Sequence, residues 1–95
     1  MTEEMLKAVL ETAQAKTDKE GLTTVPEGRL VTLYAAHDGV ALTVSKVERL
    51  RLANGMIRAE NTKAETFFVA LADVFAAAVE GKDQPNARKA PGFFG

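Results

Sequence analysis

The chain has 95 residues, 46% of them hydrophobic, and twelve basic residues nearly balance thirteen acidic ones, leaving a net charge of -1. This composition indicates a single globular domain with a modest core, and argues against a disordered chain and a strongly basic nucleic-acid coat. Because cysteine is absent, disulfides, thiolate nucleophiles and zinc–thiolate sites are excluded.

An amphipathic helix is predicted over residues 2–16. Thr2 is a suitable N-cap, and Glu3 and Glu4 place negative charge in the first turn, where the helix dipole favours it. The apolar residues that recur at helical spacing are Leu6, Val9, Leu10 and Ala13. The polar residues 17–28 contain Gly21, Pro26 and Gly28, which predicts a connecting loop.

A β-hairpin centred on Asn54-Gly55 is the strongest local signal. Both central residues of a type I′ turn need positive φ, which Asn and Gly adopt readily. The turn then predicts the pairs Ala53–Met56, Leu52–Ile57, Arg51–Arg58, Leu50–Ala59 and Arg49–Glu60. This register collects the apolar side chains on one face and the charged side chains on the other, so a one-residue slip would mix them.

A second hairpin is predicted at Asp38-Gly39, with His37 opposite Val40, Ala35 opposite Leu42 and Leu33 opposite Val44. The alternation breaks after Val44, which indicates a bulge at residues 45–46 that would curl the sheet. After a polar loop at 61–64, the run TFFVAL is the most hydrophobic strand and is predicted to be central.

Residues 71–80 fit two structures. Apolar residues at helical spacing, high alanine content and Gly81 after the last of them favour a helix. The alternative is a short helical turn at 72–73 followed by a last strand over 75–80. The sequence thus predicts an α+β domain over 1–81: an N-terminal helix, a strongly bent antiparallel sheet of four or five strands and a C-terminal helix. Residues 82–95 are predicted to be a flexible, disordered tail.

This layout resembles small barrels of the SH3-like and Sm-like kinds over residues 2–81. The resemblance lies in the order of the elements and includes no family motif. No functional residues are therefore transferred, and no family is assigned.

An arginine face is the sharpest functional feature. The predicted register places Arg51 opposite Arg58, and like charges directly opposite destabilise a hairpin. Glu60 can neutralise Arg49, whereas Arg51 and Arg58 need a further anion. Lys46 joins the arginine face if the bulge turns its side chain toward the arginines. Arg49, Arg51, Arg58 and Lys46 are therefore a candidate site for phosphate, nucleic-acid backbone or an acidic protein. The alternative is a solvated face whose arginines meet Glu60, Glu48 or Glu65 and cover apolar surface with their stems.

Catalytic signatures are missing. His37 is the only histidine and Ser45 the only serine, and neither lies in a motif of a nucleophile or metal site. No phosphate-binding glycine loop is present. We therefore expect no enzymatic activity, no cofactor and no metal ion.

The sequence favours a non-enzymatic protein-interaction or assembly module, a small cytoplasmic adaptor whose partner is a protein or a second copy. Near-zero net charge and the apolar faces of the first hairpin favour self-association through an edge strand or the N-terminal helix. The alternative is a small barrel that binds RNA or DNA with the arginine face. It is disfavoured because no aromatic residue interleaves with the arginines and the phenylalanines are predicted to belong to the core. No leader or membrane segment is visible, so membrane contact is not expected. In the tail, Phe93 and Phe94 are candidates for insertion into a groove of a partner, the alternative being an unstructured end.

Overall fold

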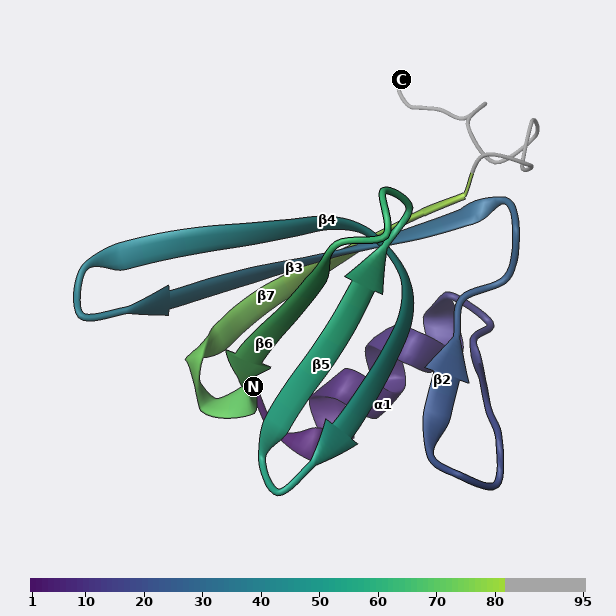
Figure 1. Cartoon of the computed structure of the whole chain (residues 1–95), viewed down its shortest axis with the longest axis horizontal. Helices are drawn as coiled ribbons and strands as arrows, with labels where there is room; N and C mark the ends of the chain where they lie inside the picture. Colours follow the sequence, from purple (N-terminus) through teal and green to yellow (C-terminus); the bar gives the residue numbers. More distant parts are fainter. Residues whose placement is uncertain (82–95) are drawn as a thin grey trace.

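The computed structural model describes residues 1–81, one N-terminal helix and a curled antiparallel sheet (Figure 1). The predicted tail, with Phe93 and Phe94, lies outside the described residues. The elements in chain order are α1 (Glu3–Thr12), β1 (Lys16–Thr17), β2 (Leu22–Thr24), β3 (Arg29–His37), β4 (Val40–Ala53), β5 (Met56–Asn61), β6 (Thr66–Ala70), the one-turn 3-10 helix η1 (Leu71–Asp73) and β7 (Val74–Gly81).

Strand β4 organises the sheet because it bends and pairs differently along its length. Its first half pairs with β3, whose other edge carries β7. Its second half pairs with β5 on one side and β2 on the other, and β6 lies beyond β5. The predicted bulge at residues 45–46 is confirmed. The register between β3 and β4 shifts between Val44 and Val47 of β4, and Lys46 has a φ of 58°. The bend gives the sheet the shape of a half-barrel, and the turn end of the β3–β4 hairpin projects beyond it (Figure 1).

Both predicted hairpins are confirmed in turn and register. Asn54 and Gly55 have φ values of 53° and 75°, as a type I′ turn requires. Leu52 lies opposite Ile57, and Arg51 lies opposite Arg58. At the other hairpin His37 pairs with Val40 around a turn whose two residues also have positive φ.

Helix α1 covers the inner face of the curled sheet and completes the core. The Thr2 hydroxyl caps it by accepting a hydrogen bond from the Met5 N–H at 3.1 Å. Leu6 and Ala13 are buried among the inward-facing residues of the strands. The most deeply buried large side chains are Leu33, Leu50, Ile57, Val31, Val44, Val47 and Val74. A single core therefore joins the helix to every long strand.

The predicted C-terminal helix is wrong. Residues 71–73 form one 3-10 turn, and β7 then runs antiparallel to β3 along most of its length. Phe75, which belongs to the predicted helical stripe, is 64% exposed. Helix propensities differ by less than about 1 kcal/mol per residue among ordinary residues, so pairing with the free edge of β3 outweighs them.

Two further predictions need correction. Residues 17–28 are not only a loop, because β1 and β2 form a short hairpin that extends the edge of β4. The run TFFVAL is not central, because among the strands of the described part of the chain β6 pairs with β5 alone. The two helices that the structure describes, α1 and η1, are too short and too polar to span a lipid bilayer.

Candidate functional site

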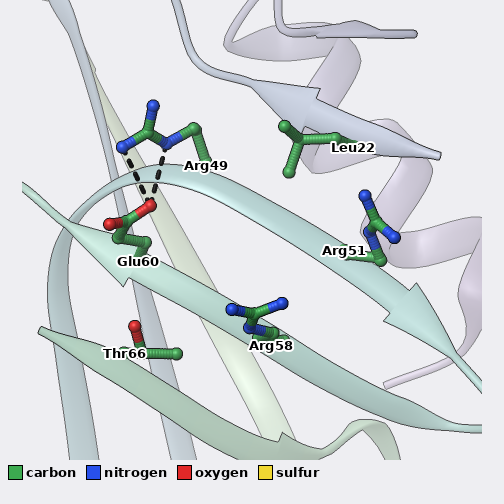
Figure 2. Close-up of a pocket in the computed structure, with 6 residues that line it drawn as sticks. All are labelled: Leu22, Arg49, Arg51, Arg58, Glu60 and Thr66. Carbon is green, nitrogen blue, oxygen red and sulfur yellow. Dashed lines mark hydrogen bonds and ion pairs between the residues drawn. The ribbon is translucent and has the colours of Figure 1, made fainter. Parts of the chain in front are cut away.

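The predicted arginine face forms a shallow cleft on the outer face of the sheet. Its hollow has a volume of about 250 Å³ and lies over β4, β5 and the neighbouring ends of β2 and β6 (Figure 2). The lining residues are Leu22, Arg49, Arg51, Arg58, Glu60 and Thr66. The arginines face outward because their neighbours Leu50, Ile57 and Ala59 point into the core.

Arg49 is neutralised within the cleft. Its Nε and Nη2 atoms each lie 2.9 Å from Glu60 Oε1, directly across the β4–β5 pair. The two side chains are partly exposed, so the ion pair adds little stability. Its effect is to keep one arginine in a defined position at the end of the cleft.

Arg51 and Arg58 are the two cations that the site leaves available. Within residues 1–81 neither forms an ion pair, although they occupy directly opposite positions on β4 and β5. Figure 2 shows both side chains on the same face, beside Leu22 and Thr66. Two guanidinium groups with this placement suit an oxyanion such as a phosphate or carboxylate.

An exposed aromatic ring adjoins the cleft, contrary to the prediction that no aromatic residue lies beside the arginines. Phe68 is 66% exposed, and the Arg58 guanidinium carbon lies 5.9 Å from the centre of its ring. Phe75, also exposed, contacts the ring of Tyr34 at a centroid separation of 6.4 Å. The prediction that the phenylalanines belong to the core was therefore wrong for these two. Alternation against the buried Val69 is the signal that places Phe68 outside.

Lys46 does not join this cleft. The bulge places it in a separate hollow that also contains Asn61, Lys63 and Glu65. Glu65 accepts a hydrogen bond from Asn61 Nδ2 at 2.8 Å. Over residues 1–81, neither Glu48 nor Glu65 pairs with the arginines of this face, so Arg49 and Glu60 form the one ion pair there.

His37 lies away from the arginines, at the end of the projecting hairpin. Its Nδ1 atom is 3.0 Å from Asp73 Oδ1, and its Nε2 atom is 3.3 Å from Asp38 Oδ2. The imidazole ring thus bridges the hairpin to η1. Among residues 1–81, no cluster of three histidine or carboxylate side chains is arranged to hold a metal ion.

Comparison of the chain with profiles of known protein families, with curated protein sequences and with solved structures gives no match.

Proposed function

We propose that this protein is a non-enzymatic interaction module that self-associates through the open edge of β6, as an assembly component or adaptor. The observation that carries this proposal is an apolar, unprotected edge. β6 has the sequence TFFVA, contains no charge or proline, and within residues 1–81 pairs on one side only. Natural edge strands usually carry charges, prolines or a covering element that prevents pairing with another chain. An edge without them is suited to adding a strand from a second copy.

The hydrogen bonds of the β5–β6 hairpin identify the backbone groups on this edge. Leu71 donates to the Gly55 carbonyl at 2.8 Å, and Asn61 donates to the Glu65 carbonyl at 3.0 Å. Hydrogen-bonded and non-hydrogen-bonded pairs alternate along an antiparallel ladder. The N–H and C=O groups of Thr66, Phe68 and Ala70 therefore point away from β5 and are available to an incoming strand.

Exposed apolar side chains flank this edge. Phe68 is 66% exposed on β6, and Val40 and Leu42 on the projecting hairpin are 70% and 40% exposed. All three line one hollow of about 170 Å³ between the hairpin and β6. A second copy that paired with β6 would cover this surface and add apolar burial to the backbone hydrogen bonds.

Phe68→Pro is expected to weaken self-association more than Phe68→Ala. Both substitutions remove the ring, but only proline removes the outward N–H. If two copies pair their β6 edges, each loses one donor worth about 1 kcal/mol, so the dissociation constant should rise roughly 30-fold beyond that of the alanine variant. Sedimentation equilibrium over a wide concentration range measures this difference.

The proline variant should stay folded, because the Phe68 N–H takes no part in the β5–β6 ladder; circular dichroism checks this. Thr66→Pro, at the first residue of the strand, gives an independent test of the same edge. A wild-type protein that stays monomeric, or equal dissociation constants for the Phe68→Pro and Phe68→Ala variants, would contradict the proposal.

Binding of RNA or DNA by the arginine face is the second candidate function. It is supported by the unpaired Arg51 and Arg58 and by the exposed Phe68 ring, which provides a stacking surface beside them. It ranks second because the net charge of the chain is -1, whereas nucleic-acid-binding domains are usually basic.

If the arginine face binds nucleic acid, the double change Arg51→Ala, Arg58→Ala should lower the salt dependence of binding by about two counterions. Lys7→Ala on α1, at the opposite face of the sheet, is the control and should leave the slope unchanged. Fluorescence anisotropy with labelled single-stranded RNA, titrated at several salt concentrations, measures the slope for each variant. Submicromolar affinity at physiological salt that the double change abolishes would promote this function over self-association alone.

A further inference from the structure

A groove between α1 and the β1–β2 hairpin is an apolar hollow that the function proposed above does not use. It has a volume of about 360 Å³, within the size range of ligand pockets. Leu6 and Leu50 form its buried floor, and Leu10 and Leu52 form its half-buried sides. Glu3 and Glu4 lie on its rim together with Lys7, in the N-terminal half of α1. The groove thus combines an apolar interior with a rim on which two carboxylates outnumber one cation.

We propose that residues 82–95 of the same chain dock in this groove, with Phe93 and Phe94 as the apolar anchors. The segment has the complementary chemistry. It contains three basic residues against one acidic residue, and its two phenylalanines are the only large apolar residues within it. Aromatic anchors in an apolar groove with oppositely charged groups on the rim are a common arrangement of peptide recognition.

The end of β7 is within reach of the groove. Gly81 pairs with Arg29, and Arg29 Nη2 donates to Gln14 Oε1 at 3.3 Å, which places this end of the sheet beside the C-terminal end of α1. The ten residues of α1 span about 15 Å. The chain between Gly81 and Phe93 can extend to roughly 40 Å. Docking within one chain is therefore sterically allowed, and the tether raises the effective concentration of the segment to the millimolar range.

Electrostatics favours this groove over the arginine cleft for a basic segment. Within residues 1–81 the arginine cleft contains two guanidinium groups without an ion pair, which repel such a segment. The groove on α1 lies on the opposite side of the sheet and is bordered by two exposed carboxylates and one lysine. Docking there leaves the β6 edge and the arginine face accessible, so this inference is independent of the function proposed above.

Amide chemical shifts of the full chain test this docking. The double change Phe93→Ala, Phe94→Ala should shift the amide resonances of Gly21 and Leu52, which line the groove. The amide of Gly39, at the tip of the projecting hairpin, should not move. Unchanged Gly21 and Leu52 resonances would overturn the proposal.

A spin label distinguishes docking within one chain from docking between copies. Because the chain has no cysteine, Gly95→Cys accepts a single nitroxide. Broadening of the Gly21 amide is expected when the nitroxide and ¹⁵N are on the same chain. In a second sample, nitroxide-bearing chains at natural isotope abundance are mixed with unmodified ¹⁵N chains. The Gly21 amide of the ¹⁵N chains should show no broadening. Equal broadening of Gly21 in that mixture would assign the groove to a second copy and refute docking in cis.

Charge reversal on α1 tests the contribution of the rim. Glu4→Lys should reduce the broadening of Gly21, because it replaces a rim carboxylate by a cation that repels the basic segment. Glu11→Lys is the matched control: it changes the net charge equally on an exposed residue of the same helix that does not line the groove. Equal broadening in the two variants would refute the electrostatic part of the proposal.

Discussion

Replacing Leu33 with alanine is expected to lower the free energy of unfolding by about 2–5 kcal/mol. Leu33 has no exposed surface and lies at the centre of β3, between Val44 of β4 and Ala77 of β7. Truncation removes buried methyl groups and leaves a cavity that the paired strands on both sides cannot fill. Urea unfolding at one fixed protein concentration measures the loss, since self-association would otherwise alter the apparent stability.

Leu42→Ala is the matched control on the same hairpin. Leu42 shares the inner face of the β3–β4 pair, but it lies beyond the end of the core and is 40% exposed. Its truncation should cost less than about 1 kcal/mol. Similar losses at the two positions would contradict the assignment of the core to the sheet centre and of the projecting hairpin to the surface.

Asn61→Ala is expected to cost about 1–3 kcal/mol, because it removes the acceptor of two partly buried backbone hydrogen bonds. Asn61 is 8% exposed, and its Oδ1 accepts hydrogen bonds from Lys63 N–H at 3.0 Å and Glu65 N–H at 2.9 Å. These bonds close the loop that connects β5 to the edge strand β6. Urea unfolding of the wild type and the variant measures the loss in the free energy of unfolding, and the shift in the midpoint of thermal unfolding checks it.

Two further variants separate the contributions of the Asn61 side chain. Asn61→Asp keeps the Oδ1 acceptor of both backbone bonds but loses the Nδ2 donor to Glu65 and places a second carboxylate beside it, so an intermediate loss is expected. Thr62→Ala changes an exposed side chain in the same loop and should stay within about 0.5 kcal/mol of wild type. A full loss in Thr62→Ala would indicate that the loop itself, rather than the Asn61 bonds, limits stability.

The arginine site shows how far local sequence information extends. Asn54-Gly55 predicted the turn, and the turn predicted that Arg51 faces Arg58 and that Glu60 faces Arg49. This register follows from backbone geometry within a few residues, so no distant part of the chain is needed to decide it. Leu22 and Phe68 complete the surroundings of the arginines, and they come from strands whose neighbours depend on the whole fold.

Residues 71–80 show the opposite case. Their spacing and alanine content suit a helix, whereas the structure pairs them with β3 as β7. Intrinsic preferences within such a segment amount to tenths of a kcal/mol per residue, and the open edge of β3 supplies a row of hydrogen-bond partners that the segment alone cannot reveal. The same reason applies to β2, which forms on the edge of β4 beyond the end of β3.

The sequence by itself determined the two type I′ turns, the register of both hairpins, the bulge in β4 and the inward-facing side of the Asn54-Gly55 hairpin. These features depend on φ preferences and on alternation between neighbouring residues. Only the tertiary structure decided that β6 is an edge strand, that residues 74–81 are a strand and that Phe68 lies beside Arg58. Each of these depends on which strands meet after the sheet curls, and that choice is made by contacts between residues far apart in the chain.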